Sequence, residues 1–215
     1  MHEKILVFDL GGVLINLKVD RCISRFRQLM GDANMQSVLG LGADGEGIAS
    51  VSVANRQLMA DFERGNISSE RFVCEVLRSC PSGTTAEDVI EVWHSMLDEL
   101  PQARLDYLQK LKQDGYRMYL LSNGNDLHFN RINGTYHLDR YFERLFLSQE
   151  MHLAKPQKEL FEAVDSAING QHQQVIFVDD LAANREAAER FVHWTTCADL
   201  EELKAIIEKN VENTQ

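Results

Sequence analysis

The sequence predicts an α/β protein in which a doubly wound, Rossmann-like parallel sheet carries an inserted all-helical cap. Two observations lead to this prediction. Short, continuous apolar runs recur along the 215 residues with helix-like stretches between them, and residues 16–98 contain helix-like stretches alone. Continuous apolar runs are typical of strands buried on both faces of a parallel sheet. Alternation of such strands with helices is typical of a doubly wound sheet.

The strands of this sheet are expected at five apolar runs. They are Lys4–Phe8, Arg117–Leu121, Arg144–Leu147, Gln174–Val178 and Val192–Thr196. Helices are expected between them over Leu105–Gln113 and Lys158–Ala167, because the leucines and other apolar residues of each segment share one helical face.

The cap is expected to contain four helices. They are Arg21–Met30, Val53–Phe62, Glu70–Arg78 after a cap at Ser68 or Ser69, and a helix from Thr85 whose apolar face holds Val89, Val92, Trp93, Met96 and Leu97. Gly65 is expected to end one of them. The chain should therefore divide into a core, residues 1–15 and 99–215, and a cap, residues 16–98, that covers the carboxyl edge of the sheet.

Charge and composition argue against several kinds of partner. The formal net charge is −11, so the chain has no general attraction for nucleic acid or an anionic membrane surface. No apolar run approaches the roughly 20 residues that cross a bilayer, and Ile5–Phe8 is too short for a signal-peptide core. The four cysteines are scattered, without a metal-binding pattern. We expect a reduced, cytoplasmic protein; the sequence carries no signal of its oligomeric state.

Four short motifs follow four of the expected strands, at the edge where open α/β sheets bind ligands. The first is Phe8-Asp9-Leu10-Gly11-Gly12, in which Asp9 ends a strand and the glycines allow the backbone to turn sharply. A carboxylate held there can attack phosphorus and form an aspartyl phosphate. The same residues are also compatible with an ordinary turn after a strand.

The second and third motifs offer groups that suit a phosphate. Ser122-Asn123-Gly124-Asn125 supplies a hydroxyl, side-chain amides and backbone donors, although these residue types are also common in turns. In Ala154-Lys155-Pro156, the proline disfavours the α conformation at Lys155 and so holds its ammonium before the next helix. A lone Lys-Pro pair is also a common helix start.

The fourth motif is Val178-Asp179-Asp180, followed by Asn184. Two adjacent carboxylates at a strand end repel each other unless a cation lies near them. Mg²⁺ prefers oxygen ligands, and Asp9 with one or both of Asp179 and Asp180 would supply them. The alternative without a metal is that the two aspartates begin a helix, where a negative charge is favourable.

Taken together and in this order, the motifs resemble those of the haloacid dehalogenase superfamily of phosphatases. The resemblance extends from Asp9 to about Ala188, and the interval from Asp9 to Ser122 fits a helical cap inserted after the first motif. The stretches E-R-G-N-I-S, S-N-G-N-D-L-H and L-S-Q-E-M-H-L-A-K-P are most similar to the bacterial sugar-phosphate (glucose-1-phosphate) phosphatase branch. The phosphatase domain of soluble epoxide hydrolases is a more distant relative.

The resemblance implies a role for each motif residue. Asp9 would be the nucleophile and, with the carbonyl of Gly11 and with Asp179 and Asp180, a ligand of Mg²⁺. Lys155, Ser122 and Asn123 would bind the phosphoryl group, and Asn184 would support the metal site. Further candidates for substrate contact are Gly124, Asn125, His128 and, in the cap, Arg64.

One position departs from the family pattern. Most phosphatases of this family have a second aspartate two residues after the nucleophile, where this chain has Gly11. That aspartate acts as general acid and base, a role typically worth about 10²- to 10⁴-fold in rate. His128 could take its place, although such a histidine is more often a packing residue. Otherwise the leaving group needs little help, as in an anomeric sugar phosphate, or the protein is no longer a competent phosphatase.

The sequence therefore predicts a Mg²⁺-dependent phosphohydrolase of a small phosphorylated metabolite that works through an aspartyl phosphate, and the resemblance implies a sugar phosphate as the substrate. Two alternatives stay open. Metal-independent 2-haloacid dehalogenases also lack the second aspartate, although their site has no need of two further carboxylates such as Asp179 and Asp180. A catalytically degenerate member would bind a phosphorylated metabolite or a protein partner without turnover.

Overall fold

One five-stranded parallel sheet forms the centre of the molecule in the computed structural model, which describes residues 4–39, 53–170 and 173–212. Its strands are β1 (Lys4–Phe8), β2 (Arg117–Ser122), β3 (Arg144–Leu147), β4 (Gln174–Val178) and β5 (Trp194–Cys197). Their order is β3-β2-β1-β4-β5, and all neighbours are parallel. The chain thus starts in the middle, builds one side of the sheet and then the other. This arrangement confirms the predicted doubly wound fold.

Four of the five strands lie where the sequence predicted them, to within one residue. The fifth was placed two residues too early, and it begins at Trp194 rather than Val192. Val192 is fully exposed, whereas Trp194 and Cys197 at the two ends of β5 are buried. Burial of the aromatic and the thiol therefore decides where the strand lies, and the β-branched Val192 is left in the preceding loop.

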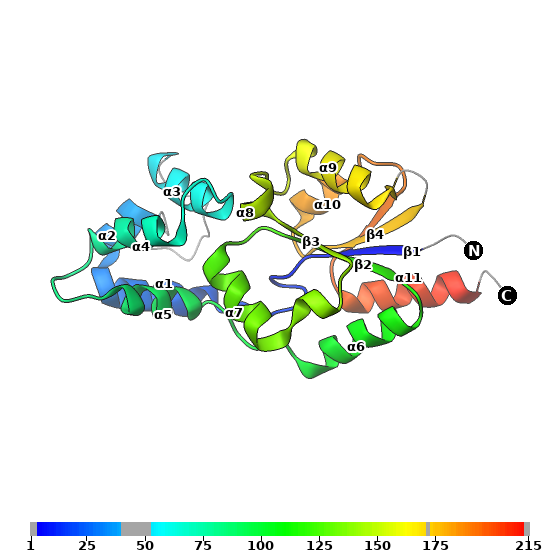
Figure 1. Ribbon diagram of the computed structural model, residues 1–215, viewed down its shortest axis with the longest axis horizontal. Coiled ribbons are helices and arrows are strands. Elements are labelled where there is room, and N and C mark those ends of the chain that lie inside the picture. The colour runs from blue at the N-terminus through cyan, green and yellow to red at the C-terminus, as the bar shows by residue number, and fades with distance from the viewer. Residues whose placement is uncertain (1–3, 40–52, 171–172, 213–215) are drawn as a thin grey trace.

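Helices cover both faces of the sheet (Figure 1). Three of them pack on one face, α6 (Gln102–Gln113), α7 (Asp126–Tyr136) and α11 (Leu200–Glu212), and two on the other, α9 (Lys158–Ile168) and α10 (Ala182–Ala188). The side chains of β1 alternate between the two hydrophobic clusters, because Leu6 and Phe8 enter one and Ile5 and Val7 the other. The short helices η2 (Leu138–Arg140) and α8 (Ser148–Met151) complete the core.

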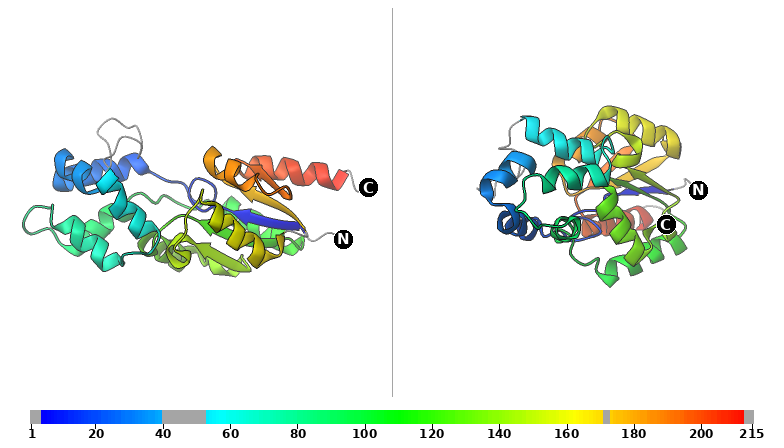
Figure 2. Two further views of the ribbon diagram at one scale, coloured as in Figure 1. Left: turned by 90° about the horizontal axis from the view of Figure 1, so that it is seen from above. Right: turned by 60° about the vertical axis from the view of Figure 1, so that its left-hand side comes forward.

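In the described parts of the chain, five further helices, here termed the cap helices, gather beyond the carboxyl ends of the strands (Figures 1 and 2). They are α1 (Val19–Met30), α2 (Asp32–Leu39), α3 (Val53–Glu63), α4 (Ser69–Leu77) and α5 (Ala86–His94). They enclose a hydrophobic cluster of their own that includes Phe26, Phe62, Phe72 and Trp93. The separate cluster explains how this insertion can keep its shape beside the sheet.

The local signals in the cap sequence are mostly confirmed. Ser68 caps α4, and Thr85 caps α5 in a reciprocal capping box with Asp88. Gly65 adopts a positive φ of 64° after α3. The prediction that Met96 and Leu97 extend the last helix was wrong, because α5 ends at His94.

Two chain segments, residues 16–18 and 96–98, join the cap helices to the core as a short antiparallel pair. Lys18 N donates to Met96 O at 2.7 Å, and Asp98 N donates to Asn16 O at 3.0 Å. Leu17 and Leu97 form the bridge between them. Arg21, on the first turn of α1, donates to the carbonyls of Ser95 and Leu97 at 2.6 and 2.7 Å. The linkers are therefore fixed to each other as well as to the cap.

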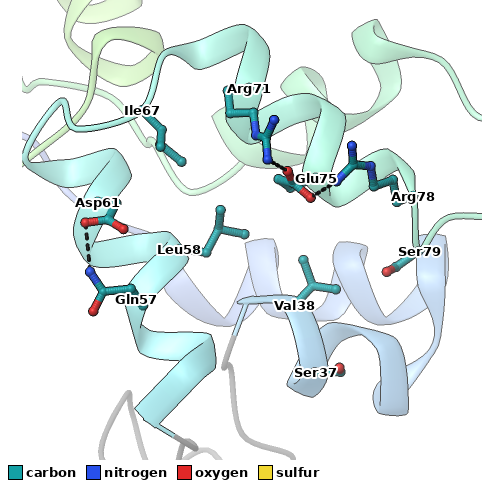
Figure 3. A pocket seen from close by; sticks show the side chains of 10 residues that line it. All are labelled: Ser37, Val38, Gln57, Leu58, Asp61, Ile67, Arg71, Glu75, Arg78 and Ser79. Atoms are coloured by element: carbon teal, nitrogen blue, oxygen red, sulfur yellow. Dashed lines mark hydrogen bonds and ion pairs between the residues drawn. The ribbon is translucent and has the colours of Figure 1, made fainter.

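A hollow of about 450 Å³ lies among α2, α3 and α4 rather than at the edge of the sheet (Figure 3). Its charged side chains neutralise one another, since Glu75 pairs with both Arg71 and Arg78 at 2.5 Å. It lacks the carboxylates of the predicted site.

Across the described ranges, no helix is long and apolar enough to span a bilayer.

Candidate active site

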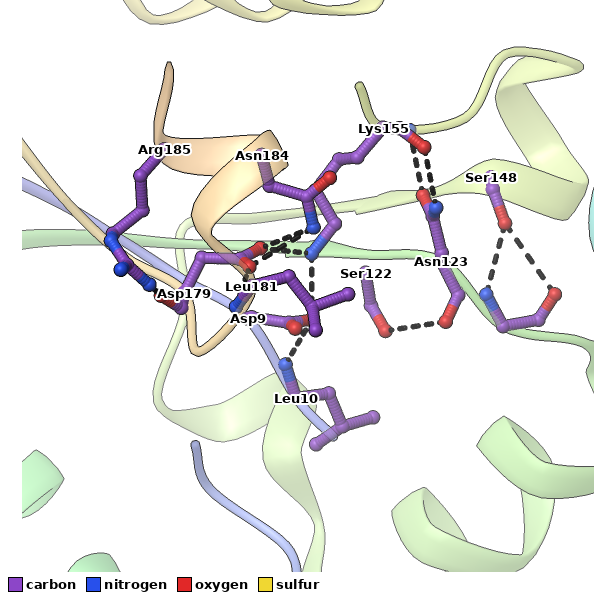
Figure 4. Close-up of polar contacts among 11 residues, drawn as sticks. Asp9, Leu10, Ser122, Asn123, Ser148, Lys155, Asp179, Leu181, Asn184 and Arg185 are labelled. Carbon is purple, nitrogen blue, oxygen red and sulfur yellow. Dashed lines mark hydrogen bonds and ion pairs between the residues drawn. The ribbon is translucent and has the colours of Figure 1, made fainter. Parts of the chain in front are cut away.

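The centre of the candidate site is a buried lysine between two aspartates (Figure 4). Lys155 Nζ lies 2.8 Å from Asp9 Oδ1 and 2.7 Å from Asp179 Oδ2. Only 5% of Lys155, 7% of Asp9 and none of Asp179 is exposed. The register places the last residue of β1, Phe8, beside Leu120 of β2 and Val178 of β4, so the residues that follow these strands meet at one edge. That edge is where the strand order reverses.

Asp179 is held by more contacts than Lys155 alone. Its Oδ1 accepts from Leu181 N at 2.9 Å, and Asn184 Nδ2 lies 3.0 and 3.1 Å from its two oxygens. Arg185 Nη1 donates to the backbone carbonyls of Asp179 and Asp180, at 2.7 and 2.9 Å. Both carboxylate oxygens of Asp179 are thus engaged by protein donors.

The pKa values follow from this crowding of charge in a buried place. Burial, reinforced by Asp179, raises the pKa of Asp9 to about 6, although Lys155 opposes the shift. Burial and the neighbouring Asp179 also raise the pKa of Asp180. Burial would lower the pKa of Lys155, but Asp9 and Asp179 together hold it above its ordinary value. Lys155 therefore stays charged. Its single positive charge does not balance the negative charges of Asp9, Asp179 and Asp180 together.

This donor set fits a hard divalent cation. Asp9, Asp179 and Asp180 bring three carboxylate oxygens within 4.8 Å of one another, with a single lysine between two of them. All three offer the oxygen ligands that Mg²⁺ prefers. Because Asp179 is buried and fully engaged while Asp180 is exposed, Asp180 has the freer carboxylate.

The structure places the Ser-Asn pair in two different roles. Ser122 ends β2, and its Oγ makes only a long contact of 3.4 Å to the carbonyl of Asn123. The side chain of Asn123 instead forms two hydrogen bonds with the backbone of Lys155, its Nδ2 donating at 2.9 Å and its Oδ1 accepting at 2.8 Å. Asn123 therefore positions Lys155, and Ser122 keeps a hydroxyl that can turn toward a phosphate.

The two glycines after Asp9 face different neighbours. A Cβ on Gly12, whose φ is +79°, would lie 2.2 Å from Asp180 Oδ2. A Cβ on Gly11 would lie 3.0 Å from Leu17 Cδ1, on the linker to the cap. Gly12 thus leaves room for the carboxylate of Asp180, while Leu17 stands where a side chain at position 11 would begin.

Asn125 and His128 join the core to the cap helices. Asn125 Oδ1 caps α7 by accepting from His128 N at 3.0 Å, and it also accepts from Trp93 Nε1 at 3.3 Å. His128 stacks on Trp93 with ring centroids 4.9 Å apart and donates from Nε2 to the Trp93 carbonyl at 3.0 Å. Burial lowers the pKa of His128 to about 4. A neutral imidazole whose N–H is already bonded to a carbonyl is poorly suited to protonate a leaving group.

The remaining candidates, Gly124 and Arg64, lie at a second contact between the core and the cap helices. Ser148 Oγ accepts from Gly124 N at 3.0 Å and donates to the carbonyl of Glu63 at 2.5 Å. Arg64 follows Glu63, and its carbonyl accepts from His152 Nδ1 at 2.8 Å. The loop after β2 and the turn after α3 are thus connected through one hydroxyl.

Sequence reasoning did not single out Arg185, Ser148 or Leu17. Arg185 fixes the backbone of the aspartate pair, but an arginine on the first turns of a helix carries no distinctive signal. Ser148 directly follows β3 at the ligand-binding edge, which was a usable signal. The contact of Leu17 with Gly11 depends on how the linker folds back, which no local pattern reveals.

A buried lysine between two carboxylates, at the switch point of a doubly wound parallel sheet, defines a Rossmann-like α/β protein with a charged site at its ligand-binding edge. Residues 3–191 match the family model of the haloacid dehalogenase-like hydrolases. The chain therefore belongs to this family, as the motifs predicted, and it is a hydrolase of the phosphatase type.

Curated relatives and solved structures agree with this assignment. The chain is 25% identical to D-ribitol-5-phosphate phosphatase of Bacteroides thetaiotaomicron, over 84% of each chain. It is 26% identical to the sesquiterpene phosphatase astK of Aspergillus oryzae, over 93% of this chain and 96% of the relative.

Among solved structures, a haloacid dehalogenase family enzyme of B. thetaiotaomicron in complex with magnesium and inorganic phosphate superposes with a TM-score of 0.74. It is 30% identical over 92% of this chain and 93% of the other. An L-2-haloacid dehalogenase shares the fold with a TM-score of 0.57 at 17% identity, over 91% of this chain and 86% of the other.

Proposed function

We propose that this protein is a Mg²⁺-dependent phosphohydrolase that removes the phosphoryl group from a small sugar or polyol phosphate. The observation that carries the proposal is the buried Asp9–Lys155–Asp179 centre with Asp180 beside it. The Mg²⁺ and phosphate complex of the structural relative, and the polyol phosphate in the name of the curated relative, support the cofactor and the substrate class.

Asp9 is the nucleophile in the proposed reaction. One of its oxygens attacks phosphorus, the P–O bond to the leaving group breaks, and an aspartyl phosphate forms. Lys155 lies 2.8 Å from Asp9 Oδ1 and can also reach a phosphoryl oxygen, so it stabilises charge as the transferring group moves. Ser122 donates its hydroxyl to another phosphoryl oxygen. Water then attacks the aspartyl phosphate and releases inorganic phosphate.

The metal ligands we propose are Asp9, Asp180 and the carbonyl of Gly11. Mg²⁺ bound there would neutralise charge on the carboxylates and on the phosphoryl oxygens. Asp179 serves chiefly as the counter-ion that holds Lys155, and Asn184 fixes the carboxylate of Asp179. Asn123 holds the backbone of Lys155 in place.

The leaving group departs without a side-chain acid from position 11. Gly11 has no side chain and Leu17 lies over it, so the proton comes from water or the leaving group leaves as a stable anion. The segment 16–98 acts as a cap over the substrate, and its closure excludes bulk water from the aspartyl phosphate.

The test is phosphate release from a panel that contains D-ribitol 5-phosphate, hexose phosphates, farnesyl phosphate and 4-nitrophenyl phosphate, with and without Mg²⁺. We expect turnover that requires Mg²⁺, favours the sugar or polyol phosphates and disappears in Asp9→Asn. Asp106→Asn, on the exposed surface of α6, is the matched control and should keep full activity. Mass spectrometry of the quenched wild type should find one phosphoryl group on Asp9.

Each alternative has its own outcome in this experiment. Metal-free chloride release from 2-chloropropionate, with no phosphate release, would favour a dehalogenase. Binding of phosphorylated metabolites without any turnover would favour a degenerate, binding-only member. Farnesyl phosphate as the best substrate would keep the phosphatase assignment but overturn the sugar or polyol class.

A further inference from the structure

The turn between α3 and α4 touches the core directly. The last two residues of α3 and the start of this turn, residues 62–66 and here termed the cap turn, bind the segment after β3 through Ser148 Oγ, which donates to Glu63 O at 2.5 Å. A Cβ on Gly65 would lie only 2.1 Å from the backbone oxygen of Gln149. The two backbones can approach so closely only because residue 65 has no side chain.

The same contact borders the phosphate-binding loop. Ser148 Oγ also accepts from Gly124 N at 3.0 Å, two residues after Ser122 (Figure 4). Because β3 is the neighbour of β2, the residues that follow it lie one strand farther along the same edge. The cap turn therefore stands beside the phosphoryl site, where a leaving group attached to the phosphate would extend.

Two polar atoms in this contact are buried and have no partner among the described residues. They are Nε of Arg64, a hydrogen-bond donor, and Oε1 of Gln149, an acceptor, and Gln149 is only 7% exposed. Buried polar groups in native proteins nearly always have a partner, so each exception calls for a physical reason. A donor on the cap side and an acceptor on the core side are thus left over where the cap turn meets the segment after β3.

A hydroxyl group is able to pair with either atom, because it donates one hydrogen bond and accepts others. A carbonyl or an ether would satisfy Arg64 alone, and an ammonium would satisfy Gln149 alone. The carboxyl of Glu63, whose pKa is raised by burial against the opposing effect of Arg64, adds a third polar group to the contact. The contact is therefore suited to a hydroxylated carbon chain rather than to an apolar one.

We propose that Arg64 and Gln149 form a specificity subsite for a hydroxyl group of the leaving group. This inference rests on the proposed phosphohydrolase function and assigns its selectivity for polyol and sugar phosphates to this contact between cap and core. The substrate enters while the cap turn is lifted from Gln149, and closure of the turn encloses its hydroxyl between the two side chains. Arg64 and Gln149 act on specificity and take no part in the chemical step.

The test is a ratio of kcat/KM values, for D-ribitol 5-phosphate over 4-nitrophenyl phosphate, which has no hydroxyl to offer. Gln149→Met removes the acceptor at similar volume, and Arg64→Lys keeps the charge but removes Nε. Each variant should lower the ratio by about 10- to 100-fold, as expected for an unmade hydrogen bond in a buried site. Asn66→Ala is the control, because Asn66 is an exposed residue of the same turn that bonds to Asp61.

Two results would overturn the proposal. An equal loss of kcat/KM on both substrates would leave the ratio unchanged and mean that the two side chains only hold the cap turn in place, whereas kcat/KM values that stay the same for both substrates would mean that the side chains do not contact the substrate. If the wild type hydrolyses nothing, the proposed function itself fails. Calorimetric binding of D-ribitol 5-phosphate to Asp9→Asn then decides the subsite: about tenfold or more weakening on adding Gln149→Met supports it, and equal affinity overturns it.

Discussion

At the scale of single residues, the site depends on two glycines as well as on its charged side chains. Gly12 leaves space for the carboxylate of Asp180, and Gly65 leaves space for the backbone of Gln149. Both glycines also adopt positive φ angles, +79° and +64°, that other residues rarely tolerate. A methyl group at either position would displace a neighbour that we assign to the metal site or to the substrate subsite.

Gly12→Ala should therefore weaken Mg²⁺ binding more than it weakens the fold. Its Cβ would lie 2.2 Å from Asp180 Oδ2, so the carboxylate must move, and we expect at least about a tenfold loss of Mg²⁺ affinity, as when groups that orient metal ligands are altered. Calorimetric titration with Mg²⁺ measures this. Gly31→Ala is the matched control, since Gly31 has the same φ of +79° but no atom within 4 Å of the added Cβ. Equal Mg²⁺ affinities in the two variants would contradict the assignment of Asp180.

The second residue-scale prediction concerns the missing acid and base. Gly11→Asp combined with Leu17→Ala should raise kcat for alkyl phosphates, which are poor leaving groups, by about tenfold or more. Gly11→Asp alone should gain less, because Leu17 Cδ1 lies 3.0 Å from the new Cβ. The measurement is kcat on an alkyl phosphate relative to 4-nitrophenyl phosphate, with Leu17→Ala as control. The single Gly11→Asp variant performing as well as the double variant would show that Leu17 is no obstacle.

Sequence patterns predicted which residues meet at this site better than what each one does there. Asp9, Lys155 and Asp179 come together because each follows a buried strand or loop at one edge of a parallel sheet. The side chain of Asn123, expected on the phosphate, turns to the backbone of Lys155 instead. Motif spacing places a residue on an edge, but the choice of partner depends on loop geometry that is decided only in the folded chain.

At the scale of elements, the two linkers between cap and core hold the position of the cap. Arg21 reaches from α1 to two carbonyls of the second linker, those of Ser95 and Leu97. Its guanidinium also lies 3.8 Å from Asp98, which in turn pairs with Lys18 at 3.5 Å. Because the ion pairs are partly exposed, most of the stabilisation should come from the hydrogen bonds to carbonyls.

Arg21→Met should loosen this connection without unfolding the cap. The variant loses two charge-assisted hydrogen bonds, and we expect the free energy of unfolding to fall by about 1–3 kcal/mol. Hydrogen exchange should speed up at the amides of Lys18 and Asp98, which bridge the linkers. Arg25→Met, on the same helix but with an exposed side chain, is the control and should leave the exchange of both amides unaltered. Protection that stays the same in Arg21→Met would contradict the prediction.

Elements with strong local signals were predicted and elements with weaker ones were missed. The strands β1, β3 and β4 coincide with the apolar runs, and Thr85 caps α5 as its sequence suggests. The helix α11 was missed although Leu200, Leu203 and Ile207 recur at helical spacing. The helices α7 and α10 have weak apolar periodicity, because polar motif residues occupy their first turns. Hydrophobic periodicity therefore did not predict them.

At the scale of the whole molecule, the described residues form three hydrophobic clusters that belong to two bodies, the core and the cap helices. The interface between these two bodies is here called the seam. Two clusters lie on the two faces of the sheet and the third inside the cap helices. Among the described residues, contacts across the seam away from the linkers gather where the cap turn meets Ser148 and His152 and where the end of α5 meets Asn125, Leu127 and His128. No sequence period encodes such a seam, because its partners come from different elements and meet only after both bodies have folded.

Acidification should weaken this seam through His128. Burial lowers its pKa to about 4 from an ordinary value of 6.5, and its neighbour His94 adds to the shift. Between these two pH values the unfolded chain binds a proton that the folded chain does not. The contribution of His128 to stability is therefore complete above pH 6.5 and is lost as the pH falls toward 4.

The measurement is the melting temperature from pH 7.5 to pH 5 for the wild type and for His128→Gln, which does not titrate but can still donate to the Trp93 carbonyl. The wild type should lose several degrees more than the variant over this range. The raised pKa of Asp9 acts in the opposite sense, favouring the folded state as the pH falls, but it is present in both proteins and cancels in the difference. Parallel curves would mean that His128 takes up its proton in the folded state as readily as in the unfolded one. In that case the Trp93 stack would be open to water, and the seam would depend chiefly on the cap turn and the linkers.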